Sequence, residues 1–96
     1  MSYLKKLTES DVKKRMNKMS AWDINAKCSE ITRTFKTTSF VTGLSLVARI
    51  AVYAEIINHH PIIELHADKV KVRLSTNSAK GLTKLDFELA KRIDTL

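Results

Sequence analysis

Residues 39–61, SFVTGLSLVARIAVYAEIINHHP, decide the fold of this chain. Ser39 is a residue type that caps helix N-termini, and Pro61 pushes the residue before it out of the α conformation. The sequence therefore predicts a long helix between these two residues. We expect one apolar stripe of the helix to pack on a sheet: Phe40, Leu44, Val47, Ile50, Ala54 and Ile57.

The predicted helix is also apolar outside this stripe. Val41, Ala48 and Val52 widen the stripe, and Leu46 and Tyr53 lie further round the helix. A helix that is apolar over so much of its circumference is usually covered on more than one side. In a chain of 96 residues we expect another subunit to provide the second cover, so the sequence predicts a homo-oligomer.

Two predicted strands follow the helix. Residues 69–76 alternate between basic and apolar side chains, with Val70, Val72 and Leu74 on one side, which indicates a half-buried strand. Residues 62–66 form its partner, and a two-residue hairpin loop at Ala67-Asp68 joins the pair.

Helices are predicted near both ends of the chain. Thr8 and Asp11 stand three residues apart, as in a capping box, and begin a helix over residues 9–19. Thr83 and Asp86 repeat this spacing and begin a closing helix. We expect the buried side of the closing helix to contain Leu82, Leu85, Leu89, Ala90 and Ile93.

A first pair of strands, residues 22–28 and 30–37, completes the prediction. In the second strand, Ile31, Arg33 and Phe35 alternate with threonine and lysine. The order is then α-β-β-α-β-β-α. Because helices do not alternate one-for-one with strands, we expect a single α+β domain over residues 1–96, with an antiparallel sheet and helices on one face.

Composition and charge exclude several classes of protein. No apolar segment follows the N-terminal Met-Ser-Tyr-Leu-Lys-Lys, and Cys28 is the single cysteine, so we expect a cytoplasmic protein without a secretory signal. Residues 40–57 include Arg49 and Glu55, and we interpret them as too polar and too short for a membrane span. The formal net charge is +7, but no aromatic residues interleave with the basic clusters. We therefore expect solvated basic faces rather than a nucleic-acid partner.

The candidate for chemistry is the histidine pair His59-His60, at the point where the long helix must stop. Histidine has an unperturbed pKa of about 6.5, so it both donates and accepts protons near neutral pH. The pair is therefore a candidate acid/base site. The alternative is that one histidine caps the last helical carbonyls and the other is solvated.

The predicted hairpin brings other polar residues to the same place. A two-residue loop would set residues 75–77 opposite residues 58–60, and would carry His66 to the other end of the hairpin, on the order of 20 Å away. Adjacent histidines with no third ligand nearby argue against a metal site. Asp86 would either cap Thr83 or orient a histidine.

Several motifs stand in a fixed order here: Ala54-Glu55, Asn58-His59-His60-Pro61, Val70-x-Val72-x-Leu74-Ser75-Thr76, and Gly81-Leu82-Thr83 with Asp86, Leu89 and Ala90. In order and spacing they resemble the pterin-4a-carbinolamine dehydratases, the family that in animals doubles as the dimerization cofactor of a homeodomain transcription factor. The resemblance runs from about Trp22 to Ile93. It implies a four-stranded antiparallel sheet with three helices on one face, assembled as homodimers or homotetramers.

The resemblance also implies an activity, the dehydration of 4a-hydroxytetrahydropterin to quinonoid dihydropterin. This carbon–oxygen lyase reaction takes a pterin substrate and needs neither a metal nor an organic cofactor. By resemblance, His59 and His60 transfer protons, with Glu55 and Asp86 as the supporting carboxylates of the catalytic set. The residues that would hold the pterin are Pro61, Ser75, Thr76 and Asn77.

Three positions depart from the family pattern. Asn77 stands where the family usually has a third histidine, Ala67-Asp68 where it has an aromatic residue, and Ile62-Ile63 where it has an acidic-aromatic pair. Asparagine hydrogen-bonds but transfers no proton at neutral pH. We expect a surviving pocket with activity that is reduced, absent or directed to a different pterin. The alternative is a noncatalytic dehydratase-like module for protein interaction or assembly.

Overall fold

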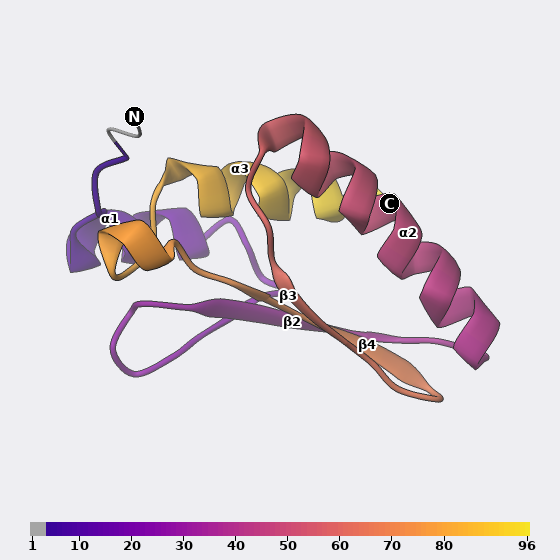
Figure 1. Cartoon of the computed structure of the whole chain (residues 1–96). Helices are drawn as coiled ribbons and strands as arrows, with labels where there is room; N and C mark the ends of the chain where they lie inside the picture. The colour runs from indigo at the N-terminus through magenta and orange to yellow at the C-terminus, as the bar shows by residue number, and fades with distance from the viewer. Residues whose placement is uncertain (1–3) are drawn as a thin grey trace.

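The computed structural model describes residues 4–96, and its elements follow the predicted order (Figure 1). A short 3₁₀ turn after the last strand, η1, is an element that the sequence pattern did not indicate. The elements are α1 (Glu9–Met16), β1 (Asp23–Ile24), β2 (Ile31–Lys36), α2 (Phe40–Ile57), β3 (Ile62–Leu65), β4 (Lys69–Leu74), η1 (Asn77–Ala79) and α3 (Lys84–Ile93).

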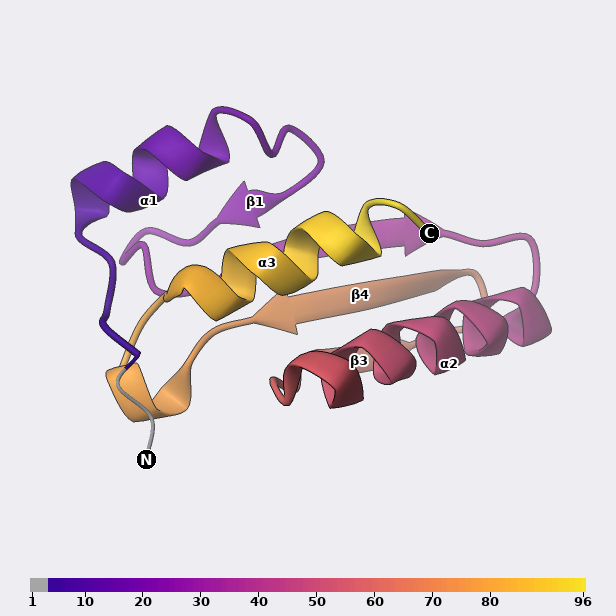
Figure 2. The ribbon, with the colours of Figure 1, turned by 90° about the horizontal axis from the view of Figure 1, so that it is seen from above.

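The four strands form one antiparallel sheet in the order β1-β2-β4-β3. Figure 1 shows the three helices on one face of this sheet, and the view from above in Figure 2 places α3 between α1 and α2. The predicted α+β class, element order and one-sided covering are therefore confirmed.

The predicted hairpin register is confirmed. Ile62 pairs with Arg73 and Leu65 with Val70, so each pair of residue numbers has the same sum. The His66 amide donates to the Lys69 carbonyl at 2.9 Å and closes the two-residue loop. His66 therefore lies at the end of the hairpin away from His59 and His60.

The core lies between the sheet and the helices. The side of β4 that faces the helices is fully buried, and α3 contributes Phe87, the largest of the fully buried side chains. Leu85, which we expected on the buried side of α3, is only half-buried. Other fully buried side chains are Val12, Ile31, Ile50, Leu82, Leu89 and Ile93.

The predicted packing stripe of α2 is partly wrong. Its buried residues are Gly43, Leu46, Ile50 and Ala54, whereas Phe40 and Leu44 are 52% and 53% exposed. The buried face of α2 is thus rotated about the helix axis relative to the predicted stripe. Gly43 explains this rotation, because a Cβ atom there would stand 2.8 Å from Leu65 Cδ1. The helix thus approaches the sheet through the one residue without a side chain, and Leu46 becomes part of the buried face.

The first predicted helix and strand are longer than the observed ones. After Met16 the chain tightens into i−3 hydrogen bonds, with the Met19 amide donating to the Met16 carbonyl at 3.0 Å. β1 stops at Ile24 because the Asn25 side chain accepts from the Ser29 and Glu30 amides, at 2.8 and 3.1 Å, and folds the chain into a turn.

The grounds on which the sequence excluded a membrane span, length and polarity, are wrong. The 18 residues of α2 have a mean hydropathy of 1.7 and are long and apolar enough to cross a membrane by length and composition alone. In the structure α2 lies against β3, β4 and α3, with 22% of these 18 residues buried. These contacts are those of a helix on the core of a globular domain.

Both ends of α2 are fixed by local hydrogen bonds. The Ser39 hydroxyl accepts from the Thr42 amide at 3.1 Å, as predicted for an N-cap. At the other end Asn58 adopts the left-handed conformation, with φ 56° and ψ 46°, and the His59 amide donates back to the Ala54 carbonyl at 2.9 Å. This Schellman-type ending turns the chain at the first histidine.

The left-handed conformation at Asn58 gives a test of this helix ending. Alanine carries a steric penalty there, so Asn58→Ala should lower the free energy of unfolding by roughly 1 kcal/mol, whereas Asn58→Gly should not lower it. Asn17 caps α1 in the right-handed conformation, with φ −57°, and supplies the matched control. Urea denaturation should find Asn17→Ala less destabilising than Asn58→Ala, and equal losses would contradict the assigned backbone.

Candidate active site

His59 is hydrogen-bonded to a buried carboxylate. Its Nε2 lies 2.5 Å from Asp86 Oδ1, and the two side chains are 10% and 0% exposed. The helix ending at Asn58 delivers the histidine, and the first turn of α3 delivers the carboxylate. Two segments 27 residues apart in sequence therefore meet here.

Asp86 has further partners at its second oxygen. Asp86 Oδ2 accepts from the Thr76 hydroxyl at 2.7 Å and from the Thr83 backbone amide at 2.9 Å. The two roles weighed for Asp86 from the sequence are thus both present in its contacts, because Oδ2 caps Thr83 and Oδ1 faces His59. A buried carboxylate is costly unless it is paired and hydrogen-bonded, and three groups meet that need here.

The direction of the surrounding hydrogen bonds follows from this carboxylate. Thr76 gives its single hydroxyl hydrogen to Asp86, so in the 2.8 Å contact between the two hydroxyls it is Thr83 that donates to Thr76. The same reasoning places a hydrogen on His59 Nε2, since a carboxylate only accepts. Nδ1 is then the ring atom of His59 left for a bound molecule.

His60 lies in a different environment. Its Nε2 contacts Glu55 Oε2, one turn back along α2, and the two side chains are 58% and 75% exposed. Exposed ion pairs of this kind contribute little to stability. The two histidines therefore have different surroundings. His59 is held by the buried carboxylate of Asp86, and His60 lies at the surface beside the exposed side chain of Glu55.

The residues predicted to hold a ligand divide into two groups. Ser75, Thr76 and Asn77 line one hollow at the end of the sheet, together with Lys80, Gly81 and the turn at residues 25–27. Of these three, Thr76 alone is hydrogen-bonded to the His59–Asp86 pair. The histidines do not line the hollow, and Pro61 lies half-buried beside them.

Two contributors to the site were not assigned a role from the sequence. The Thr83 hydroxyl completes the hydrogen bonds around Thr76, and Gly81 forms an isolated bridge with Thr76, whose amide donates to the Gly81 carbonyl at 2.8 Å. The feature of the sequence that could have indicated these two roles is the segment Gly81-Leu82-Thr83, which belongs to the motifs quoted above. Within residues 4–96, no three His, Cys, Asp or Glu residues are grouped so that they could hold a metal ion.

The hydroxyl of Thr76 gives a test of this hydrogen-bond network. Thr76→Val keeps the shape of the side chain but deprives the buried Asp86 carboxylate of a donor, so it should lower the free energy of unfolding by about 1–3 kcal/mol. Thr34 lies exposed on β2 and is the matched control, with an expected change within about 0.5 kcal/mol for Thr34→Val. Urea denaturation measures both, and similar values for the two variants would contradict the network.

Comparison with known proteins identifies the family. The sequence model of the protein family described as pterin 4 alpha carbinolamine dehydratase matches residues 5–96 of this chain. A relative from Sulfurisphaera tokodaii that carries this family's name is 39% identical, over 97% of this chain and 98% of its own. One from Aquifex aeolicus is 38% identical over 97% and 92%.

Solved structures agree with this result. The transcriptional coactivator/pterin dehydratase of Brucella melitensis superposes with a TM-score of 0.87 at 33% identity, covering 94% of this chain and 96% of its own. A pterin dehydratase-like protein identified as a RuBisCO assembly factor in the alpha-carboxysome shares the fold, with a TM-score of 0.65 at 18% identity over 78% and 87%. This chain belongs to the pterin-4a-carbinolamine dehydratase family.

Proposed function

We propose that this protein dehydrates 4a-hydroxytetrahydropterin to quinonoid dihydropterin by histidine acid/base catalysis. The observation that carries the proposal is the hydrogen bond between His59 and Asp86, in which a buried carboxylate fixes the orientation of an imidazole. Membership of the dehydratase family supports the choice of substrate. The protein is then a carbon–oxygen lyase that acts without a cofactor.

The reaction requires one proton to be given and one to be taken. A proton is added to the 4a-hydroxyl, the carbon–oxygen bond breaks and water leaves. A pterin ring nitrogen loses its proton, and its electron pair forms the new carbon–nitrogen double bond. A positioned acid or base contributes typically ~10²–10⁴-fold to such a step.

The site residues can be assigned roles on this scheme. His59 transfers protons through Nδ1, because Nε2 is held by Asp86. His60, beside Glu55, supplies a second imidazole at the surface. The Thr76 hydroxyl donates its hydrogen to Asp86, so we assign Thr76 a positioning role. Pro61, Ser75 and Asn77 would contact the pterin.

The proposal is tested by the rate of dehydration of freshly generated 4a-hydroxytetrahydropterin above the uncatalysed background. His59→Ala/His60→Ala should lower the enzymatic rate by at least ~10²-fold, because both imidazoles are removed. His66→Ala is the matched control, since His66 lies at the other end of the hairpin, and it should leave the rate unchanged. A wild-type rate that survives in the double variant would contradict histidine catalysis.

A folded wild-type protein without activity would point to Asn77 as the cause. Asn77→His restores the imidazole usual in the family and should then produce a measurable rate. If that variant is also inactive, the dehydratase proposal fails, and the second candidate, a noncatalytic module for protein interaction or assembly, takes its place. The observations that favour this candidate are Asn77 itself and the apolar surface of α2, and an assembly factor of the same fold exists.

We also propose that the chain forms a homodimer or homotetramer through the exposed face of α2. Apolar residues recur there at helical spacing and are each more than half exposed: Phe40, Val41, Leu44, Val52 and Ile56. Contiguous apolar surface on a soluble domain marks an interaction site. Further apolar residues extend the same face at Ala48 and Ala51.

Sedimentation velocity tests the assembly. The wild type should sediment faster than a single chain, and Val52→Glu, which places a charge in the middle of the apolar face, should sediment as one chain. Ala21→Glu adds the same charge at an exposed residue outside α2 and should leave the assembly intact. A monomeric wild type, or an oligomer that tolerates Val52→Glu, would contradict this interface.

A further inference from the structure

A second hollow lies between the N-terminal segment and α3, away from the histidines. It has a volume of about 430 Å³, within the range of ligand pockets. Residues on and just after α1 form one wall and residues of α3 form the other. The lining residues are Lys14, Arg15, Lys18, Met19, Phe87, Lys91 and Asp94. None of them has a role in the proposed dehydratase site.

The floor of this hollow is apolar. Met19 and Phe87 are 5% and 1% exposed, so both belong to the core and show only an edge to the hollow. The guanidinium carbon of Arg15 lies 5.7 Å from the centre of the Phe87 ring, a cation–π contact. A flat apolar group entering the hollow would meet a ring edge, a sulfur atom and a planar cation.

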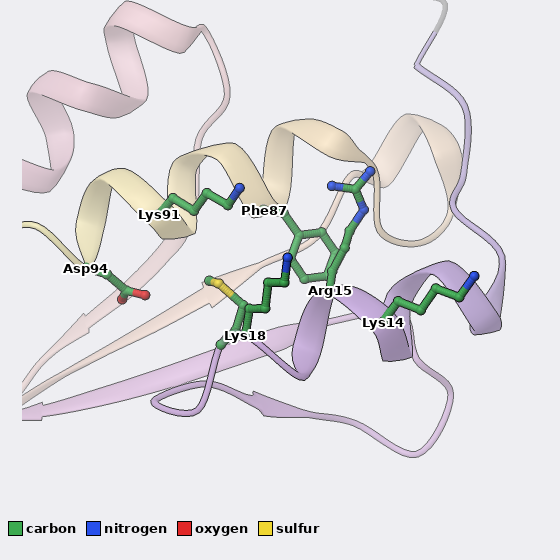
Figure 3. A pocket seen from close by; sticks show the side chains of 7 residues that line it. Lys14, Arg15, Lys18, Phe87, Lys91 and Asp94 are labelled. Carbon is green, nitrogen blue, oxygen red and sulfur yellow. The ribbon is translucent and has the colours of Figure 1, made fainter.

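The rim of the hollow is strongly positive. Within residues 4–96, no carboxylate forms an ion pair with Lys14, Arg15, Lys18 or Lys91. Figure 3 shows the ammonium ends of Lys18 and Lys91 on the same side of α3 as the Phe87 ring, whereas Lys14 extends away from it.

The one acidic residue of the lining does not balance these charges. Asp94 Oδ1 accepts from the Trp22 indole N–H at 2.8 Å and forms an ion pair with Arg33. Its charge is therefore already matched by a cation on β2. Gathered cations without counter-charges repel one another, and a bound anion relieves this repulsion.

We propose that this hollow binds a small organic anion, a phosphate or carboxylate group attached to a flat apolar ring. The ring would lie on Met19, Phe87 and the face of Arg15, and the anionic group would meet Lys18 and Lys91. A nucleic acid is the less fitting partner, because the hollow has a closed apolar floor and no exposed aromatic face on which successive bases could stack.

The probe is 1-naphthyl phosphate, titrated into the full chain and followed by calorimetry and by amide chemical shifts. Inorganic phosphate carries only the charge and 1-naphthol only the ring. The complete probe should bind at least ~10-fold more tightly than either part, because it uses both the rim and the floor. The shifted amides should fall in residues 14–19 and 87–94.

Two double variants with the same change in net charge test the rim. Lys18→Gln/Lys91→Gln should weaken binding of the probe by ~10-fold or more, since two cations that line the hollow are lost. Lys36→Gln/Lys69→Gln removes an exposed pair of lysines paired across β2 and β4, and should change binding less than twofold. All four lysines are exposed, so we expect both variants to fold.

Three results would overturn the proposal. The first is equal weakening by the two double variants, which would mean that net charge alone attracts the probe. The second is inorganic phosphate binding as tightly as the complete probe. The third is no binding of the probe alongside binding of a single-stranded oligonucleotide that both variants weaken equally, which would indicate general nucleic-acid attraction.

Discussion

The buried carboxylate of Asp86 is the interaction on which the rest of the site depends. It accepts from the imidazole of His59, the hydroxyl of Thr76 and the amide of Thr83, and so joins the end of α2, the end of β4 and the start of α3. A charge with no exposure is stable only when such partners are in place. Because the buried carboxylate of Asp86 needs these hydrogen-bond donors, the three chain segments that supply them are held in one arrangement. The position of the His59 imidazole and the packing of α3 are consequences of the same contacts.

The ending of α2 is the second feature on which the site depends, because it places His59. Asn58 takes the left-handed conformation in place of the more usual glycine, and the His59 amide donates to the Ala54 carbonyl. The chain is thereby turned so that His59 faces inward to α3 while His60 stays beside Glu55 at the surface. Two adjacent histidines, which look equivalent in the sequence, thus receive different surroundings from a single backbone turn.

How much could be predicted depended on the range of the interactions. The register of the β3–β4 hairpin followed from a two-residue loop, which is a local constraint, and it is correct. The buried face of α2 was predicted in part only, because the helix is apolar on most sides, and the close approach of Gly43 to Leu65 is a tertiary contact that the sequence pattern does not show. The sequence indicated that Asp86 would either cap Thr83 or orient a histidine. It could not show that Asp86 does both, because that depends on the separate contacts of the two carboxylate oxygens. The basic hollow could not be foreseen at all, because it arises from the placement of α1 against α3.

The replacement of the family's third histidine by Asn77 can be weighed by counting protons. Dehydration takes one proton from a ring nitrogen and gives one to the departing hydroxyl, so the protein ends with the number of protons it had at the start. A single nitrogen that accepts the first proton and donates it to the hydroxyl satisfies this balance, and His59 Nδ1 is such an atom when Asp86 holds Nε2. Water or His60 can serve as a relay where the two positions on the pterin are too far apart for one imidazole. A third imidazole therefore affects the rate of proton movement but is not required by the stoichiometry of the reaction. If the proposed dehydratase function holds, Asn77, which still donates and accepts hydrogen bonds, lowers the efficiency of the reaction without removing the chemistry.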